Sequence, residues 1–371
     1  MPMTRRLLMR RTVGMAVALG SSLLPWRSST AASCPQLLEV GWNTPEVIDL
    51  PTRIAAMEAQ APFFDGMVLD LLSNVGIATG RRDTNVHCAW LCYGPAVLAR
   101  SDYSQAIAAL MATPFQRYRA NLLKLTTRAA THDLFSPVWE SVTIPNMELL
   151  ARLAQETGCT GLWFDTEEYD GGRPFSSTWQ LHRFPPTRPQ FRRFPDYQAR
   201  SQALGTQVMQ AFQRGFPGLD VLLTFGYKVC ADKVNATHPL DTVPYNLLPA
   251  FLDGMLEVSP HYLYDGYEQA YGFGSERMFQ SALSNWAIDA WSRSSQRHKY
   301  RIGFGLWVDY ASHWDNVNAA ANYFQPMALG QAVQWGLHYT DKYVWLYSER
   351  PNWYDGSMPQ AYGEALRRSR A

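Results

Sequence analysis

Short apolar segments alternate with amphipathic segments along most of the chain, and this alternation limits the fold more than any other feature. Apolar runs rich in β-branched and aromatic residues predict buried strands, and the longer periodic stretches between them predict helices. Such an alternation is typical of parallel sheets built from βαβ units. The predicted strands cover residues 37–42, 65–70, 121–128, 161–167, 220–227, 262–268, 301–310 and 342–349.

Eight strands, each but the last followed by a predicted helix, favour a closed (β/α)8 barrel, the TIM-barrel fold. A doubly wound open sheet is disfavoured, because no Gly-x-Gly-x-x-Gly turn follows the first strand. The chain has 371 residues and shows neither an internal repeat nor a linker. We therefore predict one barrel domain over residues 34–371, elaborated by an irregular stretch at 73–100 and a Pro- and Arg-rich insertion at 173–195.

The first 33 residues have the composition of an export signal rather than of a folded domain. Thr4-Arg5-Arg6-Leu7-Leu8 resembles a twin-arginine signal, and the apolar run that follows is too short for a permanent transmembrane helix. Ala31-Ala32 suits cleavage by a signal peptidase. Residues 31–34 also form an imperfect lipobox, which leaves a lipid anchor on Cys34 open. We expect an exported protein, periplasmic or extracellular, either free or lipid-anchored.

Charge and composition narrow the classes of partner. The formal net charge is +1, so no nucleic-acid partner is expected. The chain holds 13 Trp, 19 Tyr and 17 Phe, an excess that suits sugar stacking once the core is filled. We expect neither a cofactor nor a metal, since the histidines lack the His-x-x-x-His spacing of a helical metal site. The Gly-x-Ser-x-Gly elbow of serine hydrolases is also absent.

The C-terminal ends of barrel strands carry function in this fold, so the residues at these ends are the candidates. Acidic side chains end five of the eight predicted strands, and carboxylates are rarely buried without a partner. Some of them could instead pair with a cation or cap the following helix. The residues at the strand ends are Trp42, Asn43, Asp70, Arg128, Asp165, Glu167, Tyr227, Glu268, Trp307, Asp309, Tyr347 and Glu349.

The end of the fourth predicted strand is the centre of the functional hypothesis. Because strand side chains alternate between faces, Asp165 and Glu167 point the same way, about 6.6 Å apart along the strand. Two carboxylates on one face push their pKa values apart, so that one can stay protonated as a general acid.

Residues 161–169, Gly-Leu-Trp-Phe-Asp-Thr-Glu-Glu-Tyr, resemble the fourth-strand signature of family 18 chitinases and related N-acetylglucosaminidases. The resemblance implies that Glu167 is the general acid and that Asp165 orients the acetamido group of the substrate. It covers this strand and the general barrel plan alone. Trp163 stands where that family has a further aspartate. This difference from the family's pattern argues against acetamido-assisted chemistry.

The alternative is the usual pair of carboxylates across the mouth of the barrel, about 5 Å apart in retaining glycosidases and about 6.5–9.5 Å apart in inverting ones. The candidates to face Glu167 are, in order, Glu268, Glu349 and Asp309. The parity of the strands leaves open which of them points inward.

Substrate-binding residues are expected around the same mouth. Trp353 follows an aromatic run and stands either at the rim of the cleft or over the end of the barrel. Arg128 either neutralises a carboxylate or holds an anionic sugar. The complete predicted set is Trp42, Asn43, Asp70, Arg128, Tyr227, Trp307, Tyr347 and Trp353.

These observations together predict an exported glycoside hydrolase that acts on an oligo- or polysaccharide by carboxylate acid–base chemistry. Two alternatives stay open. A non-catalytic carbohydrate-binding barrel would need the aromatic residues but no acid–base pair. A metal-dependent hydrolase would need distant His and Asp residues to converge.

Overall fold

The computed structural model describes residues 34–128, 133–169, 192–286 and 288–370. The predicted export signal lies outside these residues, and so does most of the predicted insertion at 173–195. Within the described part of the chain, no helix is both long enough and apolar enough to cross a membrane.

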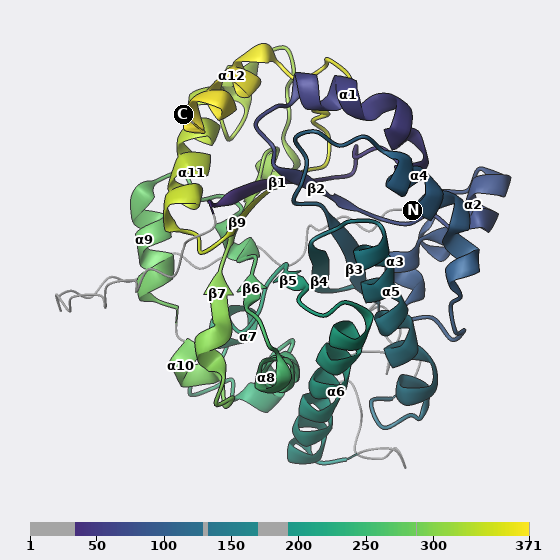
Figure 1. Ribbon diagram of the computed structural model, residues 1–371. Helices are drawn as coiled ribbons and strands as arrows, with labels where there is room; N and C mark the ends of the chain where they lie inside the picture. The colour runs from purple at the N-terminus through teal and green to yellow at the C-terminus, as the bar shows by residue number, and fades with distance from the viewer. Residues whose placement is uncertain (1–33, 129–132, 170–191, 287, 371) are drawn as a thin grey trace. The chain divides into compact units, whose positions relative to one another are not determined.

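Parallel strands form a single sheet with helices outside it (Figure 1). In the sheet the strands follow the order β7-β6-β5-β4-β3-β2-β1-β9-β8. Their bounds are β1 Gln36–Gly41, β2 Gly66–Leu69, β3 Leu122–Arg128, β4 Gly161–Tyr169, β5 Asp220–Leu223, β6 Leu263–Asp265, β7 Tyr300–Ile302, β8 Phe304–Trp307 and β9 Tyr343–Ser348.

The two edges of this sheet, β7 and β8, are consecutive in the chain and separated only by Gly303. β7 pairs with β6, whereas β8 pairs with β9, so one strand changes partner at a single residue and the ring closes. A Cβ on Gly303 would lie 2.8 Å from the carbonyl oxygen of Tyr343, which explains why glycine stands there. The (β/α)8 barrel prediction is therefore confirmed, with the predicted strand 301–310 divided in two.

Several long helices begin where the sequence places a proline in the first turn, the position at which its missing N–H costs least. These helices are α1 Leu50–Gln60, α5 Ile144–Glu156, α6 Phe194–Gly215, α8 Leu248–Val258 and α11 Pro326–Tyr339. The remaining helices include α2 Asn74–Thr79, α3 Cys88–Leu91, α4 Ser104–Ala112, α7 Lys228–Ala231, α9 Glu276–Ser284, α10 Ile288–Trp291 and α12 Gln360–Ser369.

The helices differ in three places from one continuous helix after each predicted strand but the last. Residues 276–294 hold two helices, α9 and α10, and in the segment before the last strand the long helix α11 begins only at Pro326. The C-terminal helix α12 was not predicted. It follows a stretch rich in Gly, Pro and Asp, and it buries Tyr362 and Leu366 among its charged residues.

The interior of the barrel is aromatic, which accounts for much of the aromatic excess. Trp163 and Trp345 meet edge to face with their ring centroids 5.8 Å apart. At the N-terminal end of the strands, Asp220 accepts hydrogen bonds from Tyr343 Oη at 2.7 Å and from Lys342 Nζ at 2.6 Å. Side chains therefore fill the barrel at the N-terminal end of its strands, and only the C-terminal end can admit a ligand.

Helices α6 and α8 cross at two glycines. A Cβ on Gly205 would lie 1.9 Å from the carbonyl oxygen of Phe251, and one on Gly254 would lie 1.9 Å from that of Gln202. The two backbones approach more closely here than any side chain would allow.

Candidate active site at the mouth of the barrel

Backbone strain marks the C-terminal face of the barrel. Among the described residues, the non-glycine residues with positive φ are Tyr245 (61°), Tyr267 (47°), Ala311 (62°) and Ser312 (60°). All four lie in segments that follow the C-terminal ends of β5, β6 or β8. Left-handed backbone is costly for such residues, and it concentrates where surrounding contacts hold a functional segment in place.

Asp165 and Glu167 lie in the last part of β4, which ends at Tyr169. Trp163 belongs to the interior cluster of the barrel, so Asp165 continues the inward-facing row, and the pairing of β4 with β3 becomes irregular between Asp165 and Tyr169, where Glu167 lies. Asp165 is 3% exposed, and its Oδ1 accepts the backbone N–H of Glu167 at 3.2 Å. Glu167 is less buried, and its Oε2 accepts a hydrogen bond from Tyr169 Oη at 2.9 Å. Asp165 thus supports the segment that presents Glu167.

Thr224, at the end of β5, connects this pair to the neighbouring strands. Its hydroxyl donates to Asp165 Oδ1 at 3.2 Å and accepts the backbone N–H of Thr166 at 2.9 Å. Its carbonyl oxygen accepts the backbone N–H of Glu268 at 3.1 Å. Glu268 follows β6, so one threonine holds the carboxylate-bearing segments of β4 and β6 on its two sides.

The strained turn before Glu268 has its own support. Asp265 Oδ1 accepts the backbone N–H of Tyr267 at 2.9 Å, and Asp265 Oδ2 accepts a hydrogen bond from Tyr300 Oη at 2.8 Å. Burial raises the pKa of Asp265 to about 6, although both hydrogen bonds oppose the rise. Glu268 itself is 9% exposed at the mouth.

Tyr245 lies near the acidic residues of this side of the mouth and bonds to the backbone beside Glu167. Burial raises the pKa of its phenol above the usual value, and the negative charges of Glu167, Glu168 and Glu268 raise it further. The Glu168 backbone N–H also donates to Tyr245 Oη at 3.3 Å. The phenol of Tyr245 is therefore influenced by the charges of carboxylates on β4 and on the segment after β6.

Glu349 and Asp309 lie on the other side of the ring. Asp309 is fully buried, and its carboxylate accepts the backbone N–H groups of Glu349 at 3.0 Å and Arg350 at 3.1 Å. It also accepts the indole N–H of Trp307 at 3.0 Å. Asp309 thus fastens the end of β8 to the end of β9. Glu349 Oε1 accepts a hydrogen bond from Tyr347 Oη at 3.1 Å, four strands away from β4 in the ring.

Trp42 and Tyr347 form the aromatic part of this side of the mouth. Trp42 is 70% exposed at the end of β1, and its indole N–H donates to Tyr347 Oη. The Tyr347 ring is 5% exposed, stacks on Tyr271 at 5.8 Å and lies 5.9 Å from Trp307. Asn43 plays a structural part, because its Nδ2 donates to the carbonyl oxygens of residues 349–351.

A cavity of about 200 Å³ opens beside β1, β2 and β3 at the same end of the barrel. Asp70 lies in its wall and accepts the backbone N–H of Ala89 at 3.1 Å. Burial raises the pKa of Asp70, against the opposing effect of His87 and Lys124. Arg128, at the end of β3, donates from Nη1 to Asn85 Oδ1 at 3.4 Å.

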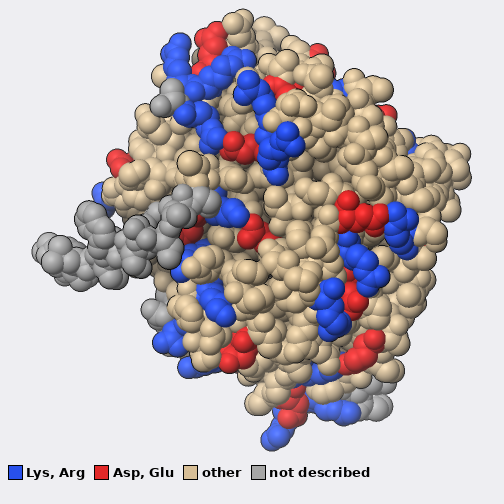
Figure 2. All heavy atoms as spheres, in the orientation of Figure 1, with Lys and Arg blue, Asp and Glu red and all other residues tan. Residues whose placement is uncertain are grey.

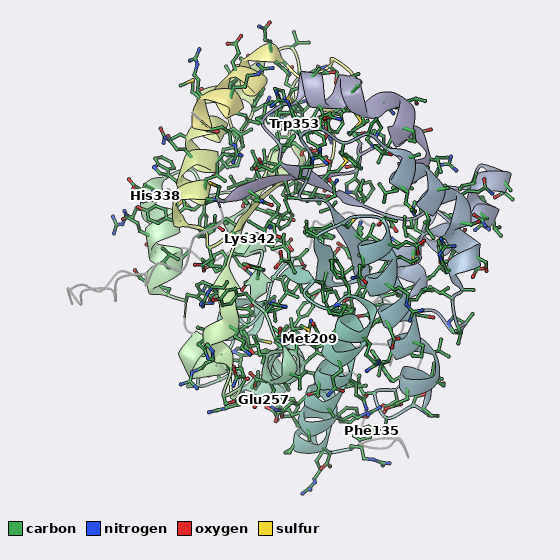
Figure 3. All side chains as sticks on the ribbon, in the orientation of Figure 1. Phe135, Met209, Glu257, His338, Lys342 and Trp353 are labelled. Atoms are coloured by element: carbon green, nitrogen blue, oxygen red, sulfur yellow. The ribbon has the colours of Figure 1, made fainter. Side chains whose placement is uncertain are left out.

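Two predicted binding residues lie away from the mouth. Tyr227 is buried outside the ring, where its hydroxyl donates to Asp253 Oδ1 on α8 at 2.7 Å. Trp353 is 3% exposed and packs edge-on against Phe63 and Phe64, and Figure 3 labels it beside α1 and α12. Trp353 therefore packs outside the ring, and both predicted positions, at the rim of the cleft and over the barrel end, are wrong. Neither side chain is placed to touch a ligand in the mouth.

Several side chains at the mouth were not predicted from the sequence. Thr224, Tyr245 and Tyr271 come from segments whose position depends on the closed ring. Lys124 carried a readable signal, because it shares the parity of the inward-facing Leu122 and would be anomalous in a barrel core. His87 lies in the irregular stretch at 73–100, for which no site residue was predicted.

The described residues contain no group of three or more His, Cys, Asp or Glu side chains placed to hold a metal ion. Figure 2 shows basic and acidic side chains interspersed over the face in view, which fits the net charge of +1.

No family model matches the sequence, and no curated protein matches it. Solved structures that align with it include GH5_18 from Streptomyces cattleya in complex with GlcNAc, at 15% identity over 92% of this chain and 82% of that one, with a TM-score of 0.44. Another is 3-keto-D-glucoside 4-epimerase from E. coli, at 13% identity over 90% and 98% of the two chains, with a TM-score of 0.39. A hyperthermophilic endocellulase from the archaeon Pyrococcus horikoshii aligns at 13% identity over 92% and 93%, with a TM-score of 0.41. Similarity at this level concerns the fold, so the function is argued from the site.

Proposed function

We propose that this protein is an exported glycoside hydrolase, with Glu167 as general acid and Glu268 as the second carboxylate. The observation that carries the proposal is that Thr224 bonds on one side to Asp165 and Thr166, beside Glu167, and on the other side to the backbone N–H of Glu268. Glycoside hydrolysis requires two carboxyl groups that flank the scissile bond, one to protonate the leaving oxygen and one to act as nucleophile or base.

The strand geometry is compatible with such a pair. β4 and β6 are separated only by β5, so their backbones lie about 9.6 Å apart across the sheet, at about 4.8 Å per strand. Side chains that point inward bring the carboxyl groups closer together than the two backbones. Separations below the backbone spacing include both the shorter one of retaining enzymes and the longer one of inverting enzymes.

Glu268 is a better partner for Glu167 than the other two candidates. Asp309 already accepts three hydrogen bonds that hold the ends of β8 and β9, and Glu349 lies across the ring from β4. The exposed indole of Trp42 supplies flat apolar surface near Glu349, as sugar binding requires.

The test is hydrolysis of a broad panel of oligo- and polysaccharides by the full chain and by Glu167→Gln. We expect kcat of the variant to fall by about 10²–10⁴-fold, because the general acid can no longer donate its proton. Glu276→Gln, on the surface of α9, is the matched control and should keep wild-type kcat.

Glu268→Gln should lose activity as severely as Glu167→Gln, and the anomeric form of the first product, read by NMR, separates retention from inversion. If both variants keep wild-type rates, the proposed pair is wrong. Sugar binding without hydrolysis of any substrate would favour the carbohydrate-binding alternative.

Export is proposed from the sequence of residues 1–33 alone. Replacement of Arg5 and Arg6 by lysine should keep the protein inside the cell, as shown by fractionation. Unchanged export of that variant would remove the twin-arginine route.

A further inference from the structure

The cavity beside β1, β2 and β3 belongs to the mouth but is not used by the proposed acid–base pair. Its walls come from the loop after β1, the end of β2, residues 82–90 and the interior of β3. At about 200 Å³ it is smaller than the roughly 300–1,000 Å³ of pockets that hold drug-sized ligands, and it has room for one sugar ring.

Lys124 is the main reason to expect a ligand in this cavity. Its side chain points from β3 into the barrel, with the ammonium group 5.5 Å from the centre of the Trp163 ring. Among the described residues, no hydrogen-bond acceptor or carboxylate lies within bonding distance of Lys124 Nζ, although the group borders the cavity. This partly exposed ammonium group can therefore donate hydrogen bonds to a ligand in the cavity.

Acceptors face the same cavity. His87 stands between two carboxylates, with Nδ1 3.4 Å from Asp70 Oδ2 and Nε2 3.8 Å from Glu46 Oε1. Arg82 Nε lies 3.6 Å from the same Glu46 oxygen. The wall therefore carries two carboxylates, Asp70 and Glu46, and two permanent cations, Lys124 and Arg82, so that these charges balance.

Two aromatic rings connect this cavity to the proposed acid. Trp90 lines the cavity, and its ring lies 5.2 Å from that of Tyr169, whose hydroxyl donates to Glu167 Oε2 at 2.9 Å. A sugar ring in the cavity would therefore lie against Trp90, with Tyr169 between Trp90 and Glu167.

We propose that this cavity, lined by Asp70, Lys124 and Trp90, is a subsite for one neutral pyranose unit of the substrate. The inference rests on the proposed function and names its substrate class. Sugar hydroxyl groups both donate and accept, so they can satisfy Asp70 and Lys124 together. The balanced charges give no net attraction to the carboxylate of a uronic acid or to the ammonium of an amino sugar.

The test is calorimetric binding of neutral, uronic-acid and glucosamine oligomers of two to six units, to the full chain with and without Glu167→Gln. Lys124→Met should weaken binding of the neutral oligomers by about 10–100-fold, as expected for a hydrogen bond to a charged group. Lys299→Met, at the opposite end of the barrel, is the matched control and should bind as the parent does.

Trp90→Leu should weaken the same ligands, and it carries the test if Lys124→Met fails to fold. Unchanged affinity in the folded variants, no binding of any neutral oligomer, or tighter binding of a charged oligomer would each overturn the subsite. Binding that depends on Lys124, combined with hydrolysis unaffected by Glu167→Gln, would overturn the proposed function and leave the subsite standing.

Discussion

Glu39 shows how a single buried carboxyl group can make stability depend on pH. It points outward from β1, is 1% exposed, and accepts a hydrogen bond from Thr44 Oγ1 at 2.7 Å. Burial raises its pKa to about 7, against the opposing effect of that hydrogen bond. The folded protein therefore binds this proton more tightly than the unfolded chain does.

The sign of the effect follows from this difference. The stabilising contribution of Glu39 is complete below pH 4.5, the ordinary pKa of the group, and is lost as the pH rises through about 7. We expect Glu39 to account for a loss of about 3 kcal/mol in the free energy of unfolding between pH 4.5 and 8. Urea unfolding of Glu39→Gln should show a shallower decline than the wild type.

Glu276→Gln, which changes an exposed carboxylate of α9, should retain the wild-type pH profile. An equally steep decline in Glu39→Gln would assign the dependence to other buried carboxyl groups, such as Asp70 or Asp65, whose pKa values burial also raises.

The parity of strand residues predicted the orientation of Asp165. This residue faces the barrel interior because the alternation that buries Trp163 carries through to it, whereas the pairing of β4 with β3 is irregular beyond Asp165, where Glu167 lies. The same alternation turns Lys124 inward, although this residue was not among the predicted site residues. Trp353 and Tyr227 were assigned to the mouth on residue type and proximity to a strand end, and both pack outside the ring.

At the scale of elements, the crossing of α6 and α8 is the packing most sensitive to a small change. A Cβ on Gly205 has backbone atoms in its way, which cannot move without separating the two helices. We expect Gly205→Ala to lower the free energy of unfolding by about 1–3 kcal/mol, the usual cost of overpacking. Chemical unfolding measures this directly.

Gly274→Ala is the matched control, because a Cβ there meets nothing within 4 Å and the backbone has no positive φ. It should leave stability unchanged or raise it slightly by restricting the unfolded chain. Equal effects in the two variants would show that the α6–α8 crossing can relax around a methyl group.

Strands were easier to predict than helix limits, for a physical reason. Buried parallel strands are continuous apolar runs, which the sequence shows directly. Helix ends depend on tertiary contacts, so α12, whose apolar residues are few, was missed. The segment that carries Tyr245 has no periodicity of its own and takes its position from the helices and strands beside it.

For the molecule as a whole, closure of the ring depends on the junction between β8 and β9. Asp309 holds this junction through three donors, two of them backbone groups. We expect Asp309→Ala to lower the free energy of unfolding by about 2–4 kcal/mol, because buried donors would lose their acceptor. Denaturant titration, with Asp309→Asn as the conservative comparison, measures the loss.

A structural role also predicts that the folded Asp309→Asn protein keeps part of its hydrolytic activity. A variant as stable as the wild type but wholly inactive would move Asp309 into the chemistry and displace Glu268. The count of eight strands predicted the closed ring from the sequence, but not the change of partner between β7 and β8, since Gly303 is one residue inside a single predicted strand.

The change of partner at Gly303 leaves a notch in the upper rim of the barrel. Above Asp265, β6 has no ladder partner on β8, and the segment 266–271 occupies the space, with Trp307 N–H donating to Tyr271 O at 3.2 Å. One wall of the mouth is therefore loop rather than strand. Residues can be inserted into or replaced in the loop 266–271 without disturbing the hydrogen bonds between the strands. Such changes would alter the surroundings of Glu268.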